Sequence, residues 1–405
     1  MKKFIFITLI LSNNLFAQQL LDVLSHIEIQ SSKITESTIK TSMLADFNTD
    51  LLKSDHDLLR LQLSNNTDII VQKSRIDLRS KDKFSWFGHI GGEINNKVSF
   101  AVVDGSISGS IFSSRGIFEI VALGNNRVQI IELNTKNFDQ CDGAVNPKVS
   151  LNEEAAKSEK IVNKGDGNTL DVLIVYSNDT LSVLGSHASV ESTAQAAIDN
   201  MNTSLLNSLF TVGVDEVRLV ATVAIDRDES GNSSSELSWL RNDAGVLALR
   251  NLYGADLVSM ISATTGCGIG YVMRSPGSGF SESAFQVTRY NCAVGNLTMA
   301  HEFGHNLGLE HNEENSSAWP NNGSYPYSFG HYHDGEYRTV MSYSAPCTMG
   351  CSRRMYYSNP DVTYLGLSTG VADSKDNTRS LEQTTLIAVN FRDTVEDNIF
   401  FDGFE

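Results

Sequence analysis

Five residues in an eleven-residue window carry most of the chemistry of this 405-residue sequence: His301, Glu302, His305, Gly308 and His311. Histidines four residues apart project from one face of an α-helix, where two imidazoles suit two corners of a tetrahedral Zn²⁺ site. Glu302 lies too far around such a helix to ligate the metal easily beside them. Its carboxylate is instead well placed to reach a water on the metal and act as a general base.

His311 can join the two other imidazoles only if the helix ends before it, because a continuing helix would turn its ring about 240° away from His305. Gly308 stands where the helix should end, and glycine adopts the left-handed conformation that terminates helices. Isolated helical histidines are mostly core or surface residues. A match at five specified positions, however, arises by chance in well under ~1 in 1,000 chains of this length, which favours a metal site.

The same pattern resembles the metzincin zinc endopeptidases, whose second characteristic motif is a methionine-containing turn. Residues 339–343, with Met341 and Tyr343, are the candidate for that turn. The resemblance implies one catalytic Zn²⁺ held by the three histidines, with Glu302 as the base. It also implies that Met341 lies beneath the metal and that Tyr343 helps to bind the oxyanion, although a packed core tyrosine is an equal alternative.

Among metzincins, the chain is most similar to the reprolysin-like bacterial enzymes, including those called peptidyl-Asp metalloendopeptidases. The likeness lies in three stretches: Cys267-Gly-Ile-Gly, Ala300-His-Glu and Tyr357-Ser-Asn-Pro. Asn312 departs from adamalysin-type sequences, which have aspartate after the third histidine. A preference for aspartate after the cut would need a cationic pocket, and Arg353 and Arg354 are the candidates for it.

The N-terminal third is expected to leave the mature protein. Residues 1–17 read as a signal peptide, with a Lys-Lys start, a short apolar run and Ala17 at a cleavage point, so we expect a secreted protein. Residues 18–144 are expected to form an inhibitory or chaperoning prodomain of mostly antiparallel strands, with 18–55 helical. The charged, glycine-bearing residues 145–168 are typical of an exposed linker open to activating cleavage.

Residues 169–395 alternate strands and helices, which predicts an α/β (α+β) metzincin-like catalytic domain with a mostly parallel sheet. Strands are expected at 170–176, 214–225, 255–262, 268–273 and 285–291, and helices at 192–209, 234–253 and 376–392. An extended substrate could add to the edge strand at 268–273. The role of the short acidic tail at 396–405 stays open.

The chain has five cysteines, and four of them should pair in an exported protein. The economical pairing is Cys267–Cys292 and Cys347–Cys351, although four cysteines allow three connectivities. Cys141 is then left free at the end of the prodomain. Its thiolate could take the coordination position of the catalytic water, as a propeptide cysteine does in several metzincin families. The alternative is an unpaired bystander.

A net charge of −17 and a pI near 4.9 argue against nucleic acid or anionic membranes as partners. The charge favours a soluble protein that works alone, so we expect a monomer, and the resemblance implies protein or peptide substrates. His331 and His333 make a second metal conceivable, but loop histidines outside a helical frame usually bind none. Nothing in the sequence decides whether structural Ca²⁺ is present.

The expected function is that of a secreted zinc-dependent endopeptidase made as a zymogen. It would hydrolyse peptide bonds by Glu302-assisted attack of a zinc-bound water, with a preference for aspartate on the primed side. Two alternatives stay open. One is a catalytically silent, zinc-stabilised binding or adhesion protein, which would not need Glu302. The other is a metallohydrolase of non-peptide substrates, because the motif specifies metal and base but not substrate.

Overall fold

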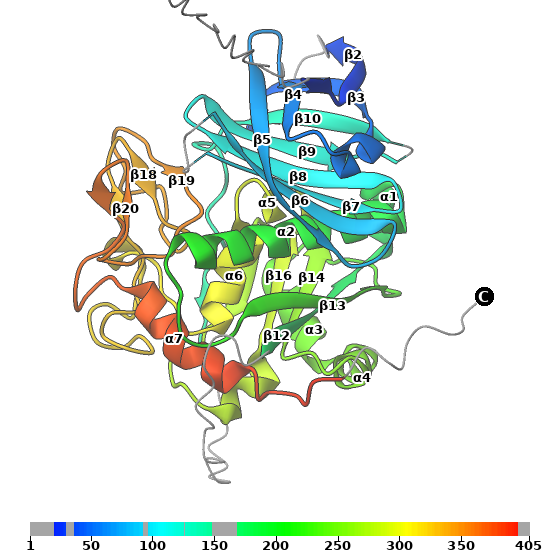
Figure 1. The fold of residues 1–405 in the computed structure, drawn as a ribbon. Coiled ribbons are helices and arrows are strands. Elements are labelled where there is room, and N and C mark those ends of the chain that lie inside the picture. The colour runs from blue at the N-terminus through cyan, green and yellow to red at the C-terminus, as the bar shows by residue number, and fades with distance from the viewer. Residues whose placement is uncertain (1–19, 30–35, 92–95, 125, 148–167, 396–405) are drawn as a thin grey trace, which may run out of the picture.

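The computed structural model describes residues 20–29, 36–91, 96–124, 126–147 and 168–395 (Figure 1). The expected signal peptide, nearly all of the expected linker and the C-terminal tail lie outside these described residues. Within them, no helix has the length and apolar character needed to cross a bilayer.

The N-terminal part of the chain is a ten-stranded sheet in the order β1-β4-β5-β6-β7-β8-β9-β10-β3-β2, antiparallel except for the β1–β4 pair. This confirms the expected antiparallel β region. The strands are β1 (Leu21–Asp22), β2 (Leu24–Ile29), β3 (Ile39–Phe47), β4 (Leu58–Gln62), β5 (Asp68–Leu78), β6 (Lys83–Ile90), β7 (Lys97–Val103), β8 (Ser106–Ser113), β9 (Gly116–Ala122) and β10 (Arg127–Leu133).

The expectation that residues 18–55 are helical is wrong. The described part of this stretch forms β1, β2, β3 and a short 3₁₀ helix, η1 (Thr49–Lys53). Met43, Ala45 and Phe47 alternate toward the core of the sheet, which is the period of a strand. Their strand, β3, pairs along its length with β10, more than eighty residues later in the chain. That long-range partner gives this polar segment its strand conformation.

The two faces of the ten-stranded sheet differ in chemistry. One face encloses an aromatic core in which Trp86 stacks on Phe100 at 5.6 Å between ring centroids. The other face packs on α2 (His187–Asn207) through β7 and β8 (Figure 1). Contacts on this second face include hydrogen bonds between small polar groups, such as Ser99 to Asn200 at 2.9 Å and Ser108 to Ser192 at 2.9 Å, beside apolar contacts of Ala101 and Phe112.

A second, six-stranded sheet forms the centre of the remaining chain, in the order β11-β15-β16-β14-β12-β13. Every neighbouring pair is parallel except β15 with β16, which confirms a mixed α/β region with a mostly parallel sheet. The strands are β11 (Ala144–Val145), β12 (Thr169–Tyr176), β13 (Glu216–Ala224), β14 (Leu257–Ser262), β15 (Gly268–Tyr271) and β16 (Phe285–Arg289).

The helices of this region are α1 (Asn178–Leu184), α2, α3 (Ser233–Asn242), α4 (Ala244–Leu252), α5 (Tyr290–Ala293), α6 (Thr298–Asn306) and α7 (Asn377–Ala388), with 3₁₀ helices η2 (Ser278–Ser283) and η3 (Glu313–Asn315). The single helix expected at 234–253 is two helices. Asp243 separates them, because its side chain accepts a hydrogen bond from the N–H of Val246 and so caps α4.

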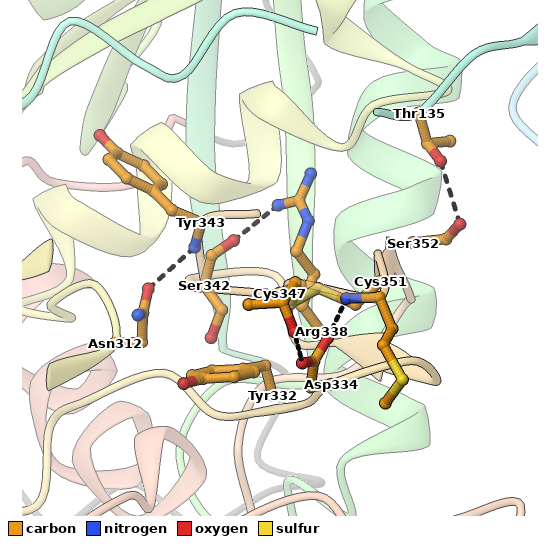
Figure 2. The surroundings of a disulfide bond; sticks show 12 residues. Thr135, Asn312, Tyr332, Asp334, Arg338, Ser342, Tyr343, Cys347, Cys351 and Ser352 are labelled. Atoms are coloured by element: carbon orange, nitrogen blue, oxygen red, sulfur yellow. Dashed lines mark hydrogen bonds between the residues drawn. A yellow bond between two sulfur atoms is a disulfide. The ribbon is translucent and has the colours of Figure 1, made fainter. Parts of the chain in front are cut away.

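Beyond α6 the chain is mainly loop, with a three-stranded sheet of β17 (Tyr332–His333), β18 (Tyr337–Arg338) and β19 (Ser352–Arg353) and a hairpin of β20 (Thr363–Tyr364) and β21 (Leu367–Ser368). Both expected disulfides form. Cys267–Cys292 joins the start of β15 to α5. Cys347–Cys351 closes the loop that precedes β19 (Figure 2).

Candidate active site

The three histidines converge at the end of α6. The helix ends at Asn306, and Gly308 follows with a φ of +81°. This left-handed turn brings His311 back, so that its Nε2 lies 3.1 Å from Nε2 of His301 and 3.0 Å from Nε2 of His305. Three ring nitrogens pointing at one centre at these separations match three corners of a tetrahedral Zn²⁺ site.

Hydrogen bonds at the opposite ring nitrogens fix two of these imidazoles. Nδ1 of His301 donates to the carbonyl of Val340 at 2.8 Å, and Nδ1 of His305 donates to the carbonyl of Leu309 at 2.7 Å. Each Nε2 is therefore left as a lone pair facing the centre. Burial lowers the pKa of His305 to about 4 and that of His301 and His311 well below the usual range, so the rings are neutral, as metal ligands must be.

Glu302 lies beside this centre and is completely buried. In the described part of the chain no group has hydrogen-bond geometry to either of its carboxylate oxygens. Burial raises the pKa of Glu302 to about 8, and the nearby thiol of Cys141 partly offsets this rise. Gly268 of β15 makes room for it, because a methyl group there would lie 2.6 Å from Oε1 of Glu302. A buried carboxylate with free oxygens next to three convergent imidazoles can exchange a proton with a reacting group.

The segment 339–343 lies under the helix that carries the histidines. Met341 is fully buried against Gly304 of α6, where an added methyl group would lie 2.5 Å from the Met341 sulfur. The ring of Tyr343 lies 4.0 Å from that of His311, measured between centroids. Asn312 ties the two loops together, since its Oδ1 accepts a hydrogen bond from the N–H of Tyr343 at 2.9 Å (Figure 2). The sequence identified Asn312 as a departure and did not reveal this role.

The chain leaving the N-terminal sheet passes directly over the site. Cys141 is buried and unpaired, and its sulfur lies within 4.8 Å of ligand atoms of His301 and Glu302. Three residues later, β11 adds to the edge strand β15 in parallel, and the N–H of Asp142 donates to the carbonyl of Gly268 at 2.8 Å. The edge that we expected to receive substrate is thus covered by this segment.

The two candidate pocket arginines lie apart. Arg353 is buried close to the centre, and its Nη1 donates to the carbonyl of Asn296 at 2.8 Å. Arg354 points away, with its guanidinium 5.6 Å from the ring centroid of Tyr364 and Nη1 donating to the carbonyl of Ser113 in β8. The structure brings Arg338, which we did not single out from the sequence, beside Arg353 instead.

His331 and His333 also approach each other, with 3.3 Å between their Nε2 atoms. No further His, Cys, Asp or Glu side chain in the described part of the chain completes a three-ligand group with them. A hydrogen bond links Nε2 of His333 to the carbonyl of Ser368 at 3.0 Å. Neither histidine belongs to the centre at His301.

Comparison with known proteins agrees with this site. The family model of the reprolysin-like metallopeptidases of family M12B matches residues 191–312, from α2 to the residue after the third histidine. A peptidyl-Asp metalloendopeptidase of Xanthomonas campestris is 25% identical over 356 residues, covering 83% of this chain and 82% of that protein. One from Stenotrophomonas maltophilia is 28% identical over 310 residues, covering 73% and 71%.

Among solved structures, metalloproteinase-II from Bacteroides fragilis aligns over 73% of this chain and 90% of its own, with 12% identity and a TM-score of 0.39. The family match, the relatives and the histidine triad together define the chain as a zinc metalloendopeptidase. More narrowly, it is a reprolysin-like metallopeptidase of family M12B.

Proposed function

We propose that this protein is a secreted endopeptidase made as a zymogen. Its parts are a signal peptide at 1–17, a prodomain at 18–144, a linker with the activation cleavage at 145–168, a catalytic domain at 169–395 and a tail at 396–405. The observation that carries the proposal is the convergence of three neutral imidazoles beside Glu302, a buried carboxylate whose oxygens have no hydrogen-bond partner among the described residues.

The residues present fit a zinc ion. His301, His305 and His311 would hold it, and a bound Zn²⁺ supplies a Lewis acid that polarises a carbonyl and makes water more acidic. Glu302 accepts a proton from the attacking water and returns it to the departing amine nitrogen. The hydroxyl of Tyr343 donates a hydrogen bond to the oxyanion that develops on the substrate. Met341 provides an apolar support under the imidazoles without competing for the metal.

The inactive state of the zymogen rests on Cys141 and β11. The sulfur of Cys141 lies where it can approach both a metal ligand and the base, and β11 pairs with the strand edge that a peptide substrate would use. Activation would then require a cut in the linker and the departure of the N-terminal part together with β11. The preference for aspartate is supported by the relatives, which are called peptidyl-Asp metalloendopeptidases, and by the cationic Arg353 near the centre.

The test uses the full chain, cut within residues 148–167, on a denatured protein mixture whose fragments are sequenced by mass spectrometry. We expect fragments that disappear with a zinc chelator and return with added Zn²⁺. The matched control is Glu302→Gln, which should keep one zinc per chain and lose about 10²–10⁴-fold in kcat. No cleavage by the wild-type chain with one zinc still bound would contradict the proposal and favour a silent zinc-stabilised binding protein.

A further inference from the structure

Two buried arginines lie side by side next to the candidate active site. Arg338 of β18 and Arg353 of β19 are directly opposite each other in a parallel strand pair. Residues so paired direct their side chains to the same face of a sheet. Both side chains are almost fully enclosed, with 3% of Arg338 and 4% of Arg353 exposed.

Neither guanidinium has the partner that a buried cation normally requires. In the described part of the chain neither forms an ion pair with a carboxylate, and each donates one hydrogen bond to a backbone carbonyl. Arg353 also lies within hydrogen-bonding reach of the Cys141 sulfur. Arg338 donates from Nη1 to Ser342 at 2.6 Å (Figure 2), and Arg353 donates from Nη1 to Asn296 at 2.8 Å. Nε of both residues is buried with no partner among the described residues. Two like charges held together in this way favour an anion between them.

Other arginines of the chain show that this arrangement is unusual for it. Arg218 and Arg227 each meet a buried carboxylate with two nitrogens, from Asp171 and Glu236 respectively. Arg250 is fully buried without a carboxylate, but its Nε, Nη1 and Nη2 each have a carbonyl acceptor. Arg250 is therefore satisfied at all three nitrogens, unlike Arg338 and Arg353. Arg289 and Arg354 also have a buried Nε with no partner among the described residues, but these two side chains are more exposed.

The charge of Arg353 reaches the reacting groups. Burial is the main cause of the lowered pKa of His301, and the neighbouring charge of Arg353 is the next. The same charge opposes the effect of burial on Glu302. In this structure the facing group is the sulfur of Cys141. Burial raises the pKa of this thiol well above its usual range, so it is a neutral neighbour of the two arginines and not a counter-ion. Once the segment 141–145 departs, Cys141 no longer covers the pair, and Glu302 is the acidic group that remains near Arg353.

We propose that Arg338 and Arg353 together bind the acidic side chain of the substrate beside the scissile bond. This inference rests on the proposed aspartate preference and assigns it to a specific pair of residues. Two adjacent guanidinium groups can bind one carboxylate through several charge-assisted hydrogen bonds, whereas an amide or methyl side chain would leave their donors unpaired. Arg354, the neighbour in sequence, takes no part because it faces Tyr364 and Ser113.

The experiment measures kcat/KM of the cut enzyme on two peptides that differ only in having Asp or Asn after the scissile bond. We expect Arg338→Gln and Arg353→Gln each to lower the Asp-to-Asn ratio on the order of 100-fold. Any loss common to both peptides cancels in this ratio. Arg354→Gln is the matched control and should keep the wild-type ratio.

Conservative substitutions distinguish a loss of substrate recognition from misfolding of the Gln variants. Arg338→Lys and Arg353→Lys retain the charge but cannot bind bidentately, so they should lower the ratio by a smaller factor with zinc content and Tm unchanged. A wild-type ratio in both Gln variants would overturn the inference while leaving the endopeptidase intact. A wild-type enzyme that cleaves both peptides equally would instead refute the proposed aspartate preference, and no cleavage at all would refute the proposed activity.

Discussion

The hydroxyl of Tyr343 donates a hydrogen bond of 3.0 Å to the backbone carbonyl of Cys141, which lies 202 residues earlier in the chain. The group proposed to bind the substrate oxyanion therefore holds the N-terminal segment in this structure. The carbonyl oxygen of Cys141 accepts the hydrogen bond from the Tyr343 hydroxyl that the substrate oxyanion would otherwise accept. Under the proposed function, competition for this hydroxyl would link inhibition of the uncut chain to catalysis by the cut enzyme.

Tyr343→Phe should separate these two roles. In the cut enzyme we expect kcat to fall about 10–100-fold with little change in KM, because the hydroxyl acts on the developing oxyanion. In the uncut chain, loss of the hydrogen bond should weaken the hold on Cys141 by about 1 kcal/mol. Steady-state kinetics on one fluorogenic peptide test the first effect. An unchanged kcat would limit Tyr343 to holding the segment.

Cys141→Ser tests whether the thiol keeps the uncut chain inactive. The serine hydroxyl is a far poorer zinc ligand than a thiolate, so the uncut variant should hydrolyse a small peptide at least about 10-fold faster than the uncut wild-type chain. After cleavage in the linker the two proteins should have the same kcat/KM. If neither uncut chain hydrolyses the peptide, the thiol is not required for inhibition and β11 alone is sufficient to block the site.

Release of the N-terminal sheet should depend on pH through Glu119. This residue of β9 is buried against the second domain, where it accepts a hydrogen bond from the N–H of Gly295 at 3.0 Å, and burial raises its pKa from 4.5 to about 8. A raised carboxyl pKa stabilises the association fully below about pH 4.5, and this stabilisation is lost as pH rises through 8. Asp199 of α2, whose pKa burial raises to about 6, acts in the same direction.

We therefore expect the cut N-terminal fragment to dissociate more readily at pH 8 than at pH 5, as measured by its Kd over that range. Glu119→Gln keeps an acceptor for Gly295 and removes the titration, so its Kd should vary less with pH. The charge of Glu119 also raises the pKa of Tyr290, so Tyr290→Phe is the control, and its Kd should keep the wild-type dependence on pH. A wild-type pH profile in Glu119→Gln would exclude this residue as the cause.

Gly304→Ala should destabilise the domain through Met341. The new methyl group would lie 2.5 Å from the Met341 sulfur, so the methionine or the helix must move, at a cost of about 1–3 kcal/mol in the free energy of unfolding. Thermal unfolding of the zinc-loaded protein measures this cost. Adding Met341→Ala should make the two changes non-additive, because the second relieves the clash that the first creates. If the changes in the free energy of unfolding are simply additive, the methyl group at position 304 does not clash with the Met341 side chain.

The zinc helix, the turn at Gly308 and the strands of the parallel sheet could be predicted because their determinants are local: ligand spacing, a glycine and runs of buried residues. The strands within residues 18–55 could not be predicted in this way, because β3 is stabilised by pairing with the distant strand β10. The pairing of Arg353 with Arg338 depends on strands fifteen residues apart lying in register, whereas the sequence suggested the adjacent Arg354.

The serines of β8 were equally hard to interpret from the sequence. Alternating Ser106, Ser108 and Ser110 resemble a solvent-exposed face, yet all three are buried against the polar side of α2.

Both disulfides lie between Cys267 and Cys351, and Cys141 forms none. A single cut in the linker therefore leaves the N-terminal sheet with no covalent tie to the rest of the protein. Before the cut the two parts share one chain and their association is independent of concentration; afterwards it obeys mass action. Dilution into a large external volume would then complete activation without a reductant or a second protease.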